Sequence, residues 1–200
     1  KAMTKTGSTR PVYISFDEWA SGFGNSITVS LMVAQHLNSF IRHADIVRMA
    51  NMTMLSNLVG YSPEGVYKNA TFRAFWLYSN NCFGTSLDVS TSCEAYSNNI
   101  FSEIPYLDVT AILNSEAGNV VVNVVNRHET KAIETDIILQ TGDFAGNAKV
   151  NEVNGKIADP GDPLAEEAVN STSSDIRFKG NTIKYSFPAH SFTQIMIPFK

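Results

Sequence analysis

The side chain best placed for chemistry is Glu18, in the run Asp17-Glu18-Trp19. It follows residues 11–17, whose apolar positions alternate as in a short β-strand that is covered on both faces. A carboxylate at the carboxyl end of a parallel strand, beside an aromatic ring, suits the nucleophile of a retaining glycosidase. Glu18 is therefore a candidate catalytic residue, and the flat face of Trp19 is a candidate wall of a sugar pocket. The three residues alone leave open the alternative of an exposed loop carboxylate without a function.

Other polar pairs have plainer explanations. His43 and Asp45 end a predicted helix, where positive charge complements the helix dipole. The pairs predicted to lie in turns or on strand surfaces are His128-Glu129, Asn151-Glu152 and His190-Ser191. Cys82 and Cys93 could form one disulfide or stay two separate thiols, and no clustered ligands accompany them to form a metal site.

The segment around Glu18 is predicted to form a β–α–β unit. Apolar residues recur at helical spacing over Ile27–His43, with Ser26 as a plausible N-cap, and Ile46–Leu55 is predicted to be a second strand. Strands joined by a helix in this way pair in parallel, and catalytic groups gather at their carboxyl ends. Glu18 falls at that end of the first strand.

The rest of the chain changes from helical to β character. After a loop with Gly60, Pro63 and Gly65, residues 71–81 are predicted to be a second helix. Short β-forming runs separated by turn signals follow, which is typical of an antiparallel β-sandwich. The runs are residues 86–89, 106–114, 120–126, 132–140, 149–153, 182–187 and 192–198. Residues 158–174, which contain Asp-Pro-Gly-Asp-Pro, are predicted to be a long surface loop.

Composition narrows the classes of function. The chain has 200 residues, with Lys plus Arg 15 and Asp plus Glu 19, which gives a formal net charge of −4. A mildly acidic chain is a poor binder of polyanions, which argues against nucleic acid and acidic membranes as partners. No apolar run reaches the length of a spanning helix. The chain begins with Lys1 instead of an initiator Met, and residues 1–10 contain no apolar signal stretch, so we expect a piece of a longer protein. Both cytoplasmic and secreted locations stay open.

Five motifs together resemble the C-terminal part of the α-L-arabinofuranosidases of glycoside hydrolase family 51. They occur in the family's order and span nearly the whole chain. The motifs are YISFDEW at 13–19, LNSFIRHADIVRMAN at 37–51, CFGTSLDV at 82–89, VVNVVNRHET at 121–130 and FPAHSFTQ at 187–194.

The resemblance implies a mainly β chain with two parts. Residues 1–83 would be the last two βα units of a (β/α)8 catalytic barrel, and residues 84–200 a C-terminal β-sandwich of jelly-roll type. It further implies retaining hydrolysis of terminal α-L-arabinofuranosyl groups on oligo- or polysaccharides, without a cofactor or metal. The family's nucleophile corresponds to Glu18, while its general acid/base lies on an earlier strand outside this chain.

The sequence departs from the family pattern at Met54, which stands where the family has a sugar-contacting Gln. Because only part of the barrel is present and the acid/base partner lies outside this chain, we expect the chain alone to be inactive, and its uncovered barrel strands to favour a homo-oligomer. Two alternatives stay open: a non-catalytic sandwich that acts as a scaffold or binds carbohydrate through Tyr96 and Tyr106, and an endo-glucanase of the same family.

Overall fold

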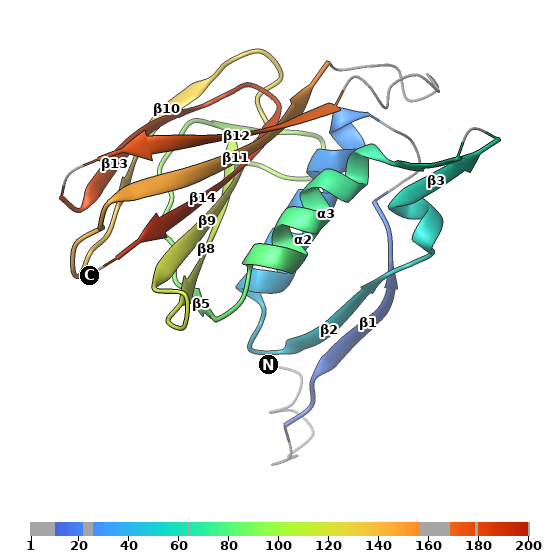
Figure 1. The fold of residues 1–200 in the computed structure, drawn as a ribbon, viewed down its shortest axis with the longest axis horizontal. Coiled ribbons are helices and arrows are strands. Elements are labelled where there is room, and N and C mark those ends of the chain that lie inside the picture. Colours follow the sequence, from blue (N-terminus) through green and yellow to red (C-terminus); the bar gives the residue numbers. More distant parts are fainter. Residues whose placement is uncertain (1–10, 22–25, 64, 157–168, 179, 200) are drawn as a thin grey trace.

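The computed structural model describes residues 11–21, 26–63, 65–156, 169–178 and 180–199. Within these ranges the elements stack in layers (Figure 1). A pair of antiparallel strands faces a six-stranded sheet, two helices cover the other side of that sheet, and a pair of parallel strands lies beyond the helices. None of the helices in the described ranges is long and apolar enough to cross a membrane.

The β–α–β unit is confirmed. Strand β1 (Ile14–Trp19) pairs in parallel with β2 (Val47–Met52), from Ile14 opposite Val47 to Trp19 opposite Met52. Helix α2 (Ile27–Arg42) joins the two strands, and the hydroxyl of Ser26 caps it by accepting from the Val29 N–H. The helix ends at Arg42, with His43 as the C-cap that the sequence predicts.

The chain between β2 and the second helix forms a hairpin, where the sequence predicts a loop. A 3₁₀ turn, η1 (Leu55–Asn57), leads into β3 (Val59–Ser62) and β4 (Gly65–Lys68). The antiparallel pairing of β3 with β4 explains the turn residues there. Helix α3 (Ala70–Asn81) follows, in agreement with the helix predicted at 71–81.

The β half consists of a large sheet and a small one. The large sheet has the strand order β12-β11-β14-β9-β8-β5, and β10 pairs with β13 in the second sheet. The strands of the large sheet are β5 (Thr85–Leu87), β8 (Leu107–Asn114), β9 (Asn119–Asn126), β11 (Asn147–Gly155), β12 (Val169–Arg177) and β14 (Ser191–Pro198). The remaining strands are β10 (Ile133–Ile138), β13 (Thr182–Phe187) and the two-residue pair β6 (Ala95–Tyr96) and β7 (Ile104–Pro105).

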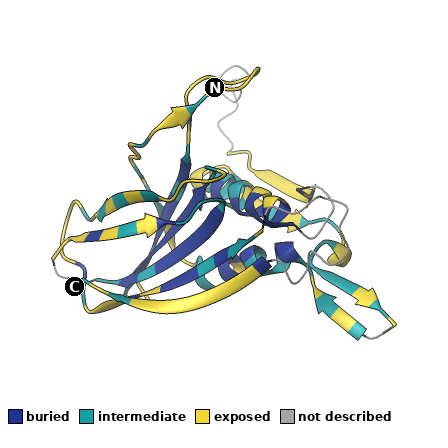
Figure 2. Ribbon diagram, turned by 90° about the horizontal axis from the view of Figure 1, so that it is seen from above, coloured by how far each residue is buried: buried dark blue, intermediate teal, exposed yellow. Residues whose placement is uncertain are grey.

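The central strands of the large sheet are buried on both faces, which explains the valine run of β9. Val120, Val122 and Val124 pack in a core between the two sheets, whereas Val125 packs in a second core under the helices. Figure 2 shows the same pattern, with buried residues concentrated along the central strands. A strand covered on both faces has apolar residues at successive positions rather than at alternate ones.

Two predictions about local structure are wrong. Residues 158–168 of the predicted surface loop at 158–174 lie outside the described residues. The last part of that predicted loop belongs to β12, which forms nine residue pairs with β11. The first strand is not covered on both faces, because only Trp19 of β1 is buried. In the described chain β1 has β2 as its one strand partner, so its outer side chains face solvent.

Candidate active site

Glu18 lies on β1 one residue before the strand ends, at the edge where β2 also ends. Its side chain is exposed and has no hydrogen-bond or ion-pair partner in the described part of the chain. The neighbouring Asp17 differs, because its carboxylate accepts a hydrogen bond from the Ser15 hydroxyl. The Thr53 N–H donates to the Trp19 carbonyl over 2.8 Å and ties the segment after β2 to the end of β1. Glu18 is thus an accessible carboxylate on an anchored strand end.

Trp19 lies in the core under this strand end. Its indole contacts Phe40 edge to face at 5.3 Å between ring centroids, and also contacts His36 at 5.7 Å and Phe75 at 6.4 Å. Only 6% of its surface is exposed, and its Nε1–H has no acceptor among the described residues. The indole supports the end of β1 from within, and the predicted contact of its face with a sugar stays a prediction.

His36, which no sequence motif singled out, holds the segment just after Glu18. The Nδ1 atom of His36 lies 2.9 Å from the Ser21 hydroxyl and 3.0 Å from the Met32 carbonyl. Ser21 is buried, so the contact fixes the backbone three residues beyond Glu18. The sequence spacing could have indicated this contact. His36 and Phe40 are four residues apart, so their side chains lie on the same face of α2, and this face contacts the ring of Trp19.

Met54 lies in the turn that follows β2, at the same edge as Glu18. It is exposed and has a positive φ of 58°, which is uncommon for a residue with a side chain. It precedes η1 and the β3–β4 hairpin, so this turn directs the chain away from the paired strand ends. The structure thus places Glu18, Trp19 and Met54 along one edge, with Glu18 and Met54 accessible and Trp19 buried.

An ion cluster clamps α2 to the large sheet. Arg42 donates to the carboxylate of Asp108 over 2.7 Å, and Arg127 approaches the other carboxylate oxygen at 3.3 Å. Arg127 also donates to the side chain of Gln35 over 2.6 Å. The two contacts made by α2, from Arg42 to Asp108 and from Gln35 to Arg127, join residues that are 66 and 92 positions apart in the sequence. They hold α2, the helix that carries His36, against the large sheet.

A buried polar network continues this clamp. Asn38 accepts from the hydroxyls of Tyr78 and Thr110, each over 2.7 Å. Gln194 donates to Asn123 over 2.9 Å and accepts from Asn81 at 2.6 Å. Burial raises the pKa of the Tyr78 hydroxyl well above its ordinary value, so it stays a donor in this network. Polar residues of the 121–130 and 187–194 motifs therefore connect the helices to the sheet.

The two cysteines are free thiols in the structure. Burial raises the pKa of Cys82 to about 12, and its sulfur lies 3.4 Å from the Asn123 amide nitrogen. The Cys93 sulfur lies 3.5 Å from the Leu107 N–H. Among the described residues no group of three or more His, Cys, Asp or Glu side chains could hold a metal ion.

Tyr96 and Tyr106, the two tyrosines considered above for carbohydrate binding, pack against each other. The rings of Tyr96 and Tyr106 lie 4.9 Å apart, and Tyr106 also contacts His128 at 4.5 Å. Both tyrosines are half-buried. The two rings therefore form one aromatic cluster with His128, and carbohydrate binding through them stays a prediction.

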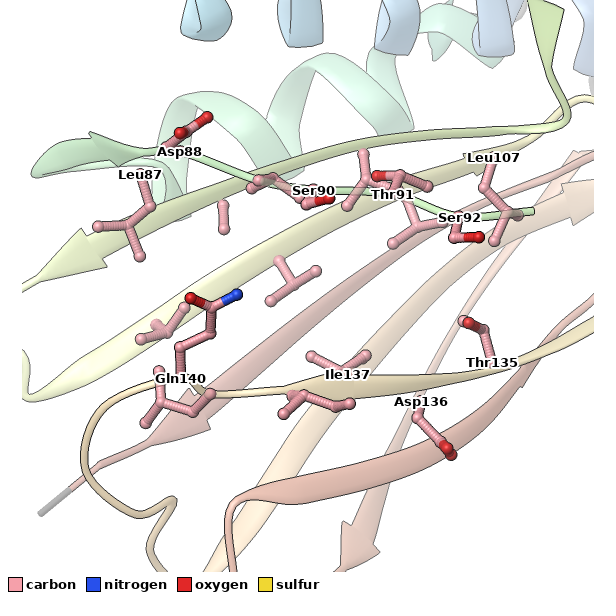
Figure 3. Close-up of a pocket in the computed structure, with 18 of the residues that line it drawn as sticks. Leu87, Asp88, Ser90, Thr91, Ser92, Leu107, Thr135, Asp136, Ile137 and Gln140 are labelled. Carbon is pink, nitrogen blue, oxygen red and sulfur yellow. The ribbon is translucent and has the colours of Figure 1, made fainter.

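A cavity of about 840 Å³ opens between the large sheet and β10 (Figure 3). Its floor consists of apolar side chains of β8 and β9, and its rim carries polar ones that include Asp88, Thr135 and Gln140. It lies on the face of the sheet opposite to the helices. The sheet and the helices therefore separate this cavity from Glu18.

Comparison with known proteins places the chain in a family. Residues 17–191 match the model of the α-L-arabinofuranosidase C-terminal domain. A probable α-L-arabinofuranosidase C from Aspergillus clavatus is 31% identical over 202 aligned residues, which cover 90% of this chain and 38% of that protein. The chain thus spans well under half the length of this relative.

Solved structures show the same fold. The α-L-arabinofuranosidase of Thermotoga maritima in complex with arabinose superposes with a TM-score of 0.80 at 21% identity, covering 98% of this chain and 45% of that one. A family 51 α-L-arabinofuranosidase from Bifidobacterium longum gives a TM-score of 0.83 at 18% identity, with 98% and 44% covered.

Proposed function

The chain belongs to the α-L-arabinofuranosidase C-terminal domain family, and on that premise we propose that it completes the active site of a retaining α-L-arabinofuranosidase, with Glu18 as the nucleophile. The substrate class is an oligo- or polysaccharide that carries terminal α-L-arabinofuranosyl groups. The observation that carries the proposal is the accessible Glu18 carboxylate at the carboxyl end of β1, beside the parallel β2.

The chemistry proceeds in two displacements. In the first, a Glu18 oxygen forms a bond to the anomeric carbon while the bond from that carbon to the leaving oxygen breaks. An upstream carboxylic acid, outside this chain, gives its proton to the leaving oxygen. In the second, water loses a proton to the same upstream carboxylate and attacks the anomeric carbon, which releases Glu18. The two carboxyl groups are expected about 5–5.5 Å apart.

We propose further that residues 1–83 are the last two βα units of a (β/α)8 barrel and that residues 84–200 form a jelly-roll sandwich. Two features support the first part: the parallel β1–β2 pair, and apolar side chains that face solvent around β1. Val12 is 62% exposed and Phe16 is 42% exposed, as expected where neighbouring barrel strands are missing. Met54 is proposed to contact the sugar from the end of β2, and Trp19 to shape the pocket from beneath.

The test uses the full-length protein and an aryl α-L-arabinofuranoside. We expect Glu18→Ala to lower kcat by more than about 10³-fold, because the covalent step is lost. Added azide is expected to restore turnover by occupying the vacated space, and to yield the glycosyl azide of inverted configuration. Asp17→Asn is the matched control, because the neighbouring Asp17 carboxylate is hydrogen-bonded to Ser15. This variant should keep kcat within a few-fold of the wild-type value.

A Glu18→Ala protein that keeps more than about a tenth of its kcat, a barrier change under roughly 1.4 kcal/mol, would refute the assignment. The 200-residue chain alone is expected to show no turnover, because its acid partner lies elsewhere. General acid–base assistance of this kind contributes about 10²–10⁴ in rate.

A further inference from the structure

The β3–β4 hairpin extends the edge on which Glu18 lies. The chain leaves β2 where Met52 pairs with Trp19, passes through η1, and forms the hairpin before it enters α3. Figure 1 shows the hairpin projecting beyond the ends of β1 and β2, away from the sheets. Segments that follow such strand ends are the usual source of binding residues in barrel enzymes.

The two faces of the hairpin differ. On one face the Tyr67 ring lies over Gly60, so closely that a Cβ at Gly60 would be 2.1 Å from the ring. On the other face Tyr61 pairs across the strands with Val66. Tyr61 is 80% exposed and Val66 is 73% exposed, so no described part of the chain packs over this apolar pair.

The exposed pair suits a neutral, partly apolar ligand. A tyrosine offers a flat apolar face and a hydroxyl, which match the C–H faces and hydroxyl groups of a sugar. The nearest basic group on the hairpin, Lys68, instead lies over the Phe72 ring at 4.9 Å. With a net charge of −4 on the chain, an uncharged glycan fits this surface better than a polyanion does.

We infer that the Tyr61–Val66 pair contacts the part of the glycan from which the terminal arabinofuranosyl group is cleaved. This inference rests on the proposed function, because Glu18 then binds the terminal sugar and the remaining chain must extend outward past the strand ends. Tyr61 would act as a specificity residue for polymeric substrates. It would contribute little to a small aryl glycoside, because that substrate lacks the further sugar units that the pair is proposed to contact.

The test compares two substrates with the full-length protein. We expect Tyr61→Ala to lower kcat/KM on arabinan about tenfold and to change kcat/KM on 4-nitrophenyl α-L-arabinofuranoside less than twofold, since a lost apolar contact in a binding site has an effect of about that size. The control is Tyr13→Ala, an exposed tyrosine at the other end of β1, which should change neither value. Val66→Thr should weaken arabinan cleavage less than Tyr61→Ala does.

Three results would overturn the inference while leaving the proposed function intact. The first is an equal fall of kcat/KM on both substrates in Tyr61→Ala, and the second is an unchanged kcat/KM on both substrates in that variant. The third is a Tm lowered by several degrees in Tyr61→Ala, which would show that the pair packs against another part of the protein or a second copy. If the wild-type protein cleaves neither substrate, the proposed function itself is wrong, and this inference fails with it.

Discussion

At the scale of single residues, the two thiols illustrate how burial controls reactivity. Burial raises the pKa of Cys82 to about 12, so only about one molecule in ten thousand carries the reactive thiolate near pH 8. We expect a disulfide reagent to modify one thiol of the native chain quickly, and the second after unfolding in guanidinium chloride. Cys93→Ser should abolish the fast phase, and two fast thiols in the wild type would contradict the burial of Cys82.

The same shift makes stability depend on pH. The folded state favours the protonated thiol of Cys82, so this group contributes stability that is fully present below its ordinary pKa and is lost as pH rises toward about 12. Between about pH 8 and pH 10.5, the free energy of unfolding of the wild type should fall by about 1–2 kcal/mol more than that of Cys82→Ser. Urea titrations at the two pH values measure the difference.

At the scale of elements, the contact between α2 and the large sheet depends on Asp108. Its carboxylate is 6% exposed and lies between Arg42 and Arg127. Asp108→Ala would leave Arg127, which is 19% exposed, without its opposite charge. We expect the free energy of unfolding to fall by about 3 kcal/mol, the lower end of the usual cost of breaking a buried ion pair from one side, because the Arg42 side chain is 41% exposed and solvent screens part of its contact.

The matched control is the exposed pair between Lys184 and Glu134 on the small sheet, with side chains 66% and 63% exposed. Solvent screens this pair, so Glu134→Ala should cost between about 0 and 1 kcal/mol. Denaturant titration compares the two variants, and hydrogen exchange should become faster in α2 for Asp108→Ala only. Equal losses in both variants would show that the clamp does not hold the helix to the sheet.

At the scale of the whole molecule, the uncovered face around β1 and β2 should control association. Val12, Phe16 and Met49 are each more than 40% exposed there. An apolar surface of this kind tends to be buried by association, so we expect the 200-residue chain to self-associate. Light scattering should show a mass that rises with concentration and falls toward the monomer in a Val12→Thr, Phe16→Ser double variant.

Ile138→Ser is the control, because Ile138 is 60% exposed on β10, in the other sheet. It should leave the association unchanged. A wild-type chain that stays monomeric at every concentration would show that the exposed strands do not associate.

The sequence by itself determined the elements whose signal is local. The spacing of apolar residues in α2, the cap at Ser26 and the valine run of β9 each specify one element with its neighbours along the chain. The position of Glu18 at a strand end also follows from sequence, because the strand and the turn are adjacent to it. Its role depends on a second carboxyl group that the resemblance places outside this chain.

Only the tertiary structure decided the features that depend on distant partners. The β12 strand has an exposed polar sequence from Asn170 to Asp175, and it becomes a strand because β11 supplies backbone partners along its length. Trp19 lies in the hydrophobic core because α2 and α3 pack against it. The network that joins Asn38 to Thr110 spans 72 positions. Periodicity reports on neighbours along the chain, whereas buried hydrogen bonds and edge pairing are specified by residues that only the folded chain brings together.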